Sequence, residues 1–177
     1  MGMYTGLRFK GVIKEKYRED IELMLEGENY WKDCKHEILK HYSKVSRSMF
    51  IPFGALAYMP NCWEYDTDGF EIYFNEETGL LCFQCSLKNY DSTIEIFLNN
   101  VASEIVEESI HIEVLYEEDK VSSLYKIKNG QLINLNYGIR YEDEDVEPCW
   151  FCETKLEKDK VNIYYEDFDF TKENCFR

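Results

Sequence analysis

The spacing of apolar residues changes twice between residues 70 and 116, and this change constrains the fold more than any other feature of the sequence. Apolar residues alternate with polar ones in 70–74 and in 81–87, and the residues 77–79 between them are typical of a turn. A helical spacing follows, with apolar positions at Ile94, Phe97, Leu98, Val101 and Ile105. Alternation returns in 110–116. We therefore predict a hairpin, a helix and a strand, with the helix packed against an antiparallel sheet.

Local signals place the ends of the predicted helices. Ser92 and Glu95 occupy the two positions of a capping box, so we expect the helix in this region to begin at Ser92. Nearer the N-terminus, a helix is predicted from Glu15 to a stop at Gly27, on the spacing of Tyr17, Ile21 and Met24. A second helix is predicted from about Tyr30, with an apolar face formed by Trp31, Cys34, Ile38, Tyr42 and Val45.

Strand signals complete the order of elements. Residues 4–13 and 161–165 are rich in β-type residues, and the pair Asn129-Gly130 between two apolar runs is typical of a two-residue hairpin turn. The resulting order is that of a β-α-β-β-α-β (ferredoxin-like) core extended by further hairpin strands. We therefore expect one α+β domain over residues 1–177, built on an antiparallel sheet.

The apolar residues of 49–63 follow neither the alternation of a strand nor the spacing of a helix. This segment contains two prolines and a glycine among apolar residues, which favours a buried, irregular connector. Because several large side chains gather here, an exposed contact loop is the alternative; they are Phe50, Phe53, Tyr58, Met59 and Trp63.

The charge of the chain narrows the classes of partner. The formal net charge is −15, of which residues 51–177 carry −17 and residues 1–50 carry +2. A surface of this sign repels nucleic acid and anionic lipid and attracts cationic proteins. With no apolar run of membrane-spanning length and no apolar signal core at the N-terminus, we expect a cytoplasmic protein that contacts neither a membrane nor nucleic acid directly.

The seven cysteines raise the question of a metal site. Two Cys-x-x-Cys pairs, Cys82/Cys85 and Cys149/Cys152, could supply four thiolates to zinc. The first pair lies in a predicted strand, where residues three apart point to opposite faces and their sulfurs diverge. The second pair follows Pro148 and suits a zinc knuckle better, so whether it binds zinc stays open. Buried, inert thiols are the favoured reading of all seven, and we expect no metal and no cofactor.

Other chemical motifs are weak. Glu64, Asp66 and Asp68 resemble part of a calcium loop, but Asn75 stands where the closing glutamate is needed, so a hairpin-entry turn is favoured. Cys34 and His41 share a predicted helix face about 10 Å apart along its axis, too far for a catalytic hydrogen bond. His36 and His111 have no partner that the sequence can identify. No catalytic residues are predicted, and the chain is not expected to be an enzyme.

Acidic clusters with neighbouring aromatic residues are the remaining signal. They could be solvated turns, but an ordered array of carboxylates can also occupy the Lys/Arg groove of a nucleic-acid-binding protein in place of phosphates. Arginine-rich surfaces also bind well to rigid aromatic rings. The predicted partner-binding residues are Glu142, Asp143, Glu144, Asp145, Trp150, Glu166, Asp167 and Asp169.

These features predict an acidic, non-catalytic protein that binds and inhibits a basic, nucleic-acid-binding protein. Small phage inhibitors of bacterial nucleases and toxin-immunity proteins act in this way, and the analogy rests on size, charge and missing catalytic motifs alone. The alternative is a cytoplasmic metal- or small-ligand-binding module with a cysteine-based site. The sequence leaves the partner, any ligand, the source and the oligomeric state open.

Overall fold

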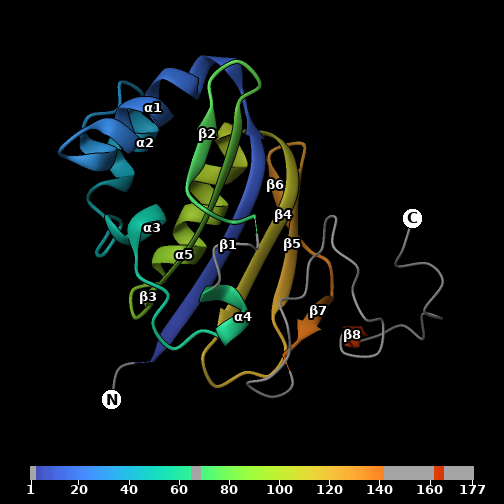
Figure 1. Ribbon diagram of the computed structural model, residues 1–177. Helices are drawn as coiled ribbons and strands as arrows, with labels where there is room; N and C mark the ends of the chain where they lie inside the picture. The colour runs from blue at the N-terminus through green and yellow to red at the C-terminus, as the bar shows by residue number, and fades with distance from the viewer. Residues whose placement is uncertain (1–2, 65–68, 142–161, 166–177) are drawn as a thin grey trace.

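A computed structural model gives the architecture of the chain (Figure 1). It describes residues 3–64, 69–141 and 162–165, of which Glu64 and residues 162–165 are described for the backbone only. The protein is of the α+β class, with an antiparallel sheet that is covered on one face by the helical run between Leu80–Lys88 (β3) and Val106–Tyr116 (β4) and on the other by Asn61–Glu64 (α4). No helix in the described ranges is long and apolar enough to cross a bilayer.

Six strands form the main sheet in the order β2-β3-β1-β4-β5-β6. Their bounds are Tyr4–Ile13 (β1), Tyr73–Asn75 (β2), Leu80–Lys88 (β3), Val106–Tyr116 (β4), Ser123–Lys128 (β5) and Gln131–Asn134 (β6). A second sheet pairs Tyr137–Arg140 (β7) with Asn162–Tyr165 (β8). The long strand β1 lies between β3 and β4 and pairs antiparallel with both, so it forms the centre of the sheet.

The helices are short. Between β1 and β2 the chain forms a 3-10 turn at Glu15–Tyr17, Arg18–Glu26 (α1), a 3-10 turn at Tyr30–Lys32, Glu37–Tyr42 (α2), Phe50–Phe53 (α3) and Asn61–Glu64 (α4). Between β3 and β4 one continuous helical run comprises Thr93–Ile96 (α5), a π-helical stretch at Phe97–Ala102 and Ser103–Ile105 (α6).

The main core lies between this helical run and the sheet. Leu7 and Phe9 from β1 and Phe83 from β3 are fully buried, and the Phe9 and Phe83 rings stack with centroids 5.1 Å apart. The predicted apolar helix face is confirmed, since Ile94, Phe97, Leu98, Val101 and Ile105 are all buried in this core or against it. Burying each such side chain contributes roughly 1.5–3 kcal/mol, which makes this helix the principal cover of the sheet.

The predicted capping box at the start of that helix is wrong. Ser92 has a left-handed backbone (φ 54°), and its side chain makes no capping hydrogen bond. Asn89 caps instead, because the Ile94 N–H donates to Asn89 Oδ1 at 3.0 Å. Glu95 then accepts hydrogen bonds from the Asn89 side-chain amide rather than from the backbone of Ser92.

The second predicted helix is interrupted. Tyr30 has φ 53°, and the chain at His36 is extended (φ −76°, ψ 134°), so the single helix predicted from Tyr30 becomes a 3-10 turn and the later α2. The backbone N–H groups of Lys35 and His36 donate to the buried carboxylate of Asp20, which competes with helical hydrogen bonds. The first helix ends before Gly27 as predicted.

The hairpin predictions hold with smaller changes. Asn129 and Gly130 both have positive φ and join β5 to β6. The strand predicted from Phe70 begins only at Tyr73, and β7 was not predicted. The connector 49–63 is irregular apart from α3 and α4 and buries Ile51, Pro52, Met59, Cys62 and Trp63.

The ferredoxin-like order as a whole is not confirmed. The sheet has six strands, because the hairpin β5–β6 continues it beyond β4. The first crossover is a series of short helices, whereas the second is one helical run. What the structure establishes is the coarser α+β class with an antiparallel sheet.

Candidate functional site

The predicted partner-binding residues lie outside the described residues. This applies to Glu142, Asp143, Glu144, Asp145, Trp150, Glu166, Asp167 and Asp169. It applies equally to Cys149 and Cys152, and to Asp66 and Asp68 of the candidate calcium loop. The described acidic cluster that lies beside a hollow is therefore the one at the end of β4.

This cluster consists of Glu117, Glu118 and Asp119, which connect β4 to β5. The Glu117 N–H donates to the Tyr4 carbonyl at 3.0 Å, and the Asp119 N–H donates to the Tyr116 carbonyl at 2.9 Å. The first bond holds the acidic turn against the first residue of β1, and the second closes the turn on the end of β4. Glu118 and Asp119 are exposed, so their charges face solvent.

A hollow of about 380 Å³ lies beside the acidic turn. The turn, the loop before α4 and the chain after β7 line it with Tyr58, Met59, Pro60, Asn61, Cys62, Leu115, Glu117, Glu118, Asp119, Lys120 and Tyr141. The Oε2 atom of Glu117 is buried, and no described residue gives it a hydrogen bond. A buried carboxylate oxygen in this state favours a cationic or hydrogen-bond-donating ligand. We name this feature the acidic hollow.

An exposed tyrosine forms part of the wall of the acidic hollow. Tyr58 is 72% exposed and has a left-handed backbone (φ 62°). Its ring stacks on Tyr4 with centroids 5.0 Å apart, so the ring is held by a neighbour despite its exposure. Rigid rings beside carboxylates suit the binding of guanidinium or ammonium groups.

The pKa of Tyr116, which directly precedes the cluster, is affected by the charges of the cluster. A modest loss of hydration, followed by the charges of Glu118, Glu117 and Asp119, raises the pKa of Tyr116 above its usual value. The part of the shift that comes from these carboxylates reflects a negative potential at Tyr116, and the same potential would attract a positive group.

A buried polar network supports the floor of the acidic hollow. The Tyr141 hydroxyl donates to Glu113 Oε1 at 2.6 Å, and His111 Nε2 lies 3.0 Å from Glu113 Oε2. Glu113 is fully buried on the face of β4 opposite the main core. Tyr141, which lines the hollow, is thus fixed by a carboxylate of the central sheet.

Arg8 completes this network from β1. Its Nε donates to Gln84 Oε1 at 3.1 Å, and one of its terminal nitrogens donates to the Cys62 carbonyl at 3.3 Å. The guanidinium lies over the rings of Trp63 and Phe70, 4.4 and 4.8 Å from their centroids. Arg8 therefore connects β1 and β3 to α4 and to the segment before β2.

The network determines the protonation of its members. Burial alone would raise the pKa of the Glu113 carboxyl, but the hydrogen bond and charge of His111, together with the Arg8 charge, lower this pKa below its usual range. Burial, and then the Glu113 charge, raises the pKa of Tyr141 well above that of a free phenol. Glu113 is therefore a carboxylate and Tyr141 a hydrogen-bond donor at neutral pH.

A close approach to β1 permits this arrangement. Gly6 lies under Met59 and Trp63, and a Cβ at this position would come within 2.7 Å of Trp63 Cζ3. Any side chain at Gly6 would displace α4 and the floor of the acidic hollow.

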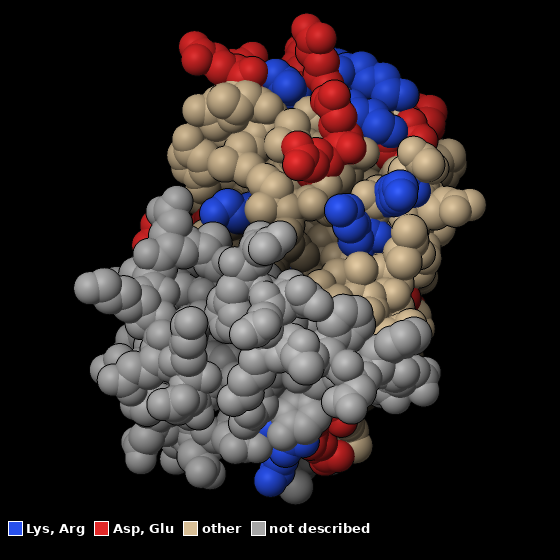
Figure 2. All heavy atoms as spheres, turned by 90° about the vertical axis from the view of Figure 1, so that its right-hand side faces the viewer, with Lys and Arg blue, Asp and Glu red and all other residues tan. Residues whose placement is uncertain are grey.

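Figure 2 views the molecule from the side of β5 and β6. It shows Lys and Arg side chains on the middle of the described surface, and acidic side chains side by side with further Lys and Arg side chains at its upper end. Charges of both signs are therefore mixed at the upper end of this side.

The described cysteines are Cys34, Cys62, Cys82 and Cys85, and all four are buried. Burial raises the pKa of the Cys34 thiol to about 12, and burial also raises the pKa of Cys85. As predicted, Cys82 and Cys85 lie on a strand; the Cys85 side chain lies in the main core, whereas the Cys82 thiol donates to the Gly69 carbonyl at 3.1 Å. In the described ranges, no group of three or more His, Cys, Asp or Glu residues could hold a metal ion.

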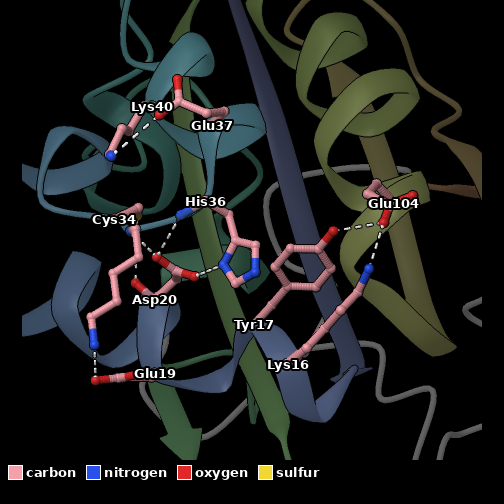
Figure 3. A network of polar contacts seen from close by, with 10 residues as sticks. Lys16, Tyr17, Glu19, Asp20, Cys34, His36, Glu37, Lys40 and Glu104 are labelled. Carbon is pink, nitrogen blue, oxygen red and sulfur yellow. Dashed lines mark hydrogen bonds and ion pairs between the residues drawn. The ribbon is translucent and has the colours of Figure 1, made fainter.

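Sequence reasoning missed two arrangements. The alternation of β1 places Arg8 on the face opposite Leu7 and Phe9, but the strand pairing that brings Arg8 near Glu113 could not be read from it. His36 contacts Asp20 of α1 rather than any cysteine, and this pair is shown in Figure 3. Comparison of the chain with known protein families, curated proteins and solved structures found no match.

Proposed function

We propose that this chain is a non-catalytic acidic protein that binds and inhibits a basic, nucleic-acid-binding protein partner. The observation that carries the proposal is the acidic hollow, in which an acidic turn and a stacked tyrosine surround a cavity of about 380 Å³. A lysine or arginine of the partner would insert between Tyr58 and Glu117, with Glu118 and Asp119 at the rim.

Two physical features support a cationic partner. Residues 51–177 carry a net charge of −17, which steers basic surfaces toward the protein over a Debye length. The buried oxygen of Glu117 offers an acceptor that a charged donor would satisfy. The acidic clusters at 142–145 and 166–169, with Trp150, are proposed to contact the same partner.

The proposal includes two finer statements. We place the protein in a reducing cytoplasm, because Cys34 and Cys85 are buried free thiols. We also propose that β1 to β4 form a split βαβ unit of the ferredoxin-like kind, since β3 separates β1 from β2 and β1 separates β3 from β4. Neither statement bears on the identity of the partner.

The test is affinity capture from the source cell or its host at low and high salt, followed by competition. We expect a captured protein that is basic, is released by salt and is displaced by nucleic acid. The purified partner should lose nucleic-acid binding when this protein is added. Capture that is insensitive to salt, or a partner that binds nucleic acid and this protein at once, would contradict the proposal.

A further inference from the structure

Tyr4, the first residue of β1, holds both a carboxylate residue and an aromatic ring of the acidic hollow. Its carbonyl accepts the Glu117 N–H at 3.0 Å, and its ring stacks on Tyr58 with centroids 5.0 Å apart and 29° between the planes. Lys88 Nζ lies 5.6 Å from the centroid of the Tyr4 ring. Glu117 and Tyr58, which are far apart in the sequence, are therefore positioned from one point of the central strand.

The buried oxygen of Glu117 lacks a hydrogen bond although a lysine stands in the lining of the hollow. No described residue donates to Glu117 Oε2, and this includes Lys120, which lines the same hollow. The charged residues of the lining are three carboxylates and one lysine, which gives a net charge of −2. A buried carboxylate oxygen without a donor is unfavourable, so a positively charged donor that enters the hollow would be bound there.

The ring of Tyr58 offers an aromatic face to such a donor. Tyr58 is 72% exposed, although Tyr4 stacks on one side of its ring. Because the stack already orders the ring, little conformational entropy is lost when a partner packs on it. The hollow thus combines a buried acceptor with an open, ordered aromatic face.

Guanidinium and ammonium groups differ in how well they fit this combination. A guanidinium is planar, so it can stack on a ring while its N–H groups donate to a carboxylate beside that ring. It is also more weakly hydrated than an ammonium, so less hydration is lost when it reaches an oxygen that solvent does not contact. An ammonium is a compact, strongly hydrated charge, for which the exposed carboxylates of Glu118 and Asp119 are the easier partners.

The groups below the floor of the hollow do not oppose a cation. Arg8 carries a positive charge there, but this charge acts on the buried Glu113 carboxylate, where it helps to lower the pKa of the carboxyl group. Tyr141 donates its hydroxyl proton to the same carboxylate. Since Glu113 offsets the charge of Arg8, the carboxylates of the acidic turn determine the sign of the potential in the hollow.

On the basis of the basic partner proposed above, we infer that the acidic hollow is an arginine-selective pocket. It binds the guanidinium of one partner residue between the Tyr58 ring and the Glu117 carboxylate. One N–H group of the guanidinium donates to Glu117 Oε2, and the plane of the group stacks on Tyr58. Its remaining N–H groups face the carboxylates of Glu118 and Asp119 at the rim. An arginine, not a lysine, is then the anchoring residue of the partner.

The test uses the full chain and three blocked peptides of the form Gly-Ser-X-Ser-Gly, in which X is arginine, lysine or citrulline. Citrulline has the shape of arginine without its charge. Titrations followed by amide proton–nitrogen NMR at low ionic strength should show the arginine peptide binding at least about threefold more tightly than the lysine peptide and about tenfold more tightly than the citrulline peptide. The largest shifts should fall on residues 58–62 and 115–120, which surround the hollow.

Two variants separate the ring from the carboxylate. Tyr58→Leu keeps an apolar side chain and removes the aromatic face, so it should lower the affinity for the arginine peptide to that for the lysine peptide. Glu117→Gln removes the charge and should lower the affinity for the arginine peptide to that for the citrulline peptide. Tyr73→Leu is the matched control, because Tyr73 is exposed on β2, about 20 Å along the sheet from Tyr4, and it should leave all three affinities unchanged.

The outcomes distinguish this pocket from the proposed function. Equal affinities for the arginine and lysine peptides, or an arginine preference that Tyr58→Leu retains, would overturn the arginine pocket and leave the basic partner standing. Shifts that map outside the hollow, or no binding of any peptide, would overturn it as well. Arginine selection at the hollow without capture of a basic partner would support the pocket and refute the proposed function.

Discussion

The hydroxyl of Tyr141 donates a hydrogen bond to Oε1 of Glu113, with 2.6 Å between the two oxygens, and this bond joins the acidic hollow to the central sheet. Glu113 also accepts from His111 and lies in the field of Arg8, so the tyrosine belongs to a buried charge network. The shape of a surface hollow thereby depends on groups that solvent does not reach.

The first prediction concerns this bond. Tyr141→Phe removes the donor and leaves a buried carboxylate oxygen with one partner fewer, which should lower the free energy of unfolding by about 1–3 kcal/mol in urea titrations. Tyr90→Phe, at an exposed tyrosine, is the matched control and should stay within about 0.5 kcal/mol of the wild type. Equal stabilities for the two variants would show that the bond is not formed in solution.

The second prediction concerns acid sensitivity. The pKa of Glu113 is lower in the folded protein than in the unfolded chain, so its contribution is fully present above the unfolded value of about 4.3 and is lost as pH falls through the folded value. Glu113→Gln should lower the free energy of unfolding at neutral pH. Below a pH of about 4.3 it should also weaken the dependence of that free energy on pH. Unfolding free energies measured across this range test it, and an unchanged slope would contradict the assignment.

The third prediction separates the two candidate caps of the helical run. Asn89→Ala removes the acceptor of the Ile94 N–H and should cost about 1 kcal/mol. Ser92→Gly should be neutral or stabilising by up to about 1 kcal/mol, because Ser92 has a left-handed backbone that glycine adopts without strain. The reverse ranking in thermal or urea unfolding would restore the capping box predicted from the sequence.

The fourth prediction concerns Cys34. A buried thiol with its pKa raised to about 12 is almost wholly protonated at neutral pH, and thiolate is the reactive form. A thiol reagent should therefore label Cys34 only as fast as the protein opens, and denaturant should accelerate the labelling. Peptide mapping identifies the modified cysteine, and rapid labelling of Cys34 in native buffer would refute its burial.

The fifth prediction concerns the proposed partner surface. The triple variant Glu117→Gln, Glu118→Gln and Asp119→Asn should slow association with the captured partner and reduce its salt dependence, because exposed charges govern encounter rates.

The control for that variant removes the same number of charges at the opposite end of β1. Glu15, Glu76 and Glu77 are exposed there, and their amide variants should leave association much closer to the wild-type rate. Association kinetics at two salt concentrations compare the two variants, and an equal effect would mean that net charge alone, without the acidic hollow, steers the partner.

The sequence predicted the elements in which apolar residues keep one regular spacing, either that of a strand or that of a helix. The alternation of β3 and the helical spacing from Ile94 to Ile105 each place a long row of side chains in one core, and the structure has both. The interrupted helix after Tyr30 could not be predicted, because its cause is Asp20, a residue on another element. Local spacing does not show which distant carboxylate will compete for a backbone N–H.

The candidate site was less predictable for the same reason. The acidic turn at 117–119 was visible as a cluster, but several others were equally visible. Only the fold shows that Tyr58, from a segment far away in sequence, lies at the same hollow. The burial of the sheet face opposite the main core was not predicted either. A charged residue within a strand, such as Arg8, is expected to be exposed to solvent, and only the structure shows that Trp63 and Phe70 cover it.

The contact of Arg8 with α4 links the local opening of this helix to that of β1. A helix of four residues has too few internal hydrogen bonds to persist alone, and its position depends on the guanidinium that binds the Cys62 carbonyl. The amide protons of α4 should accordingly exchange with solvent in step with those of β1, as one cooperative unit. On this expectation the hollow opens together with the central strand rather than separately as a surface loop.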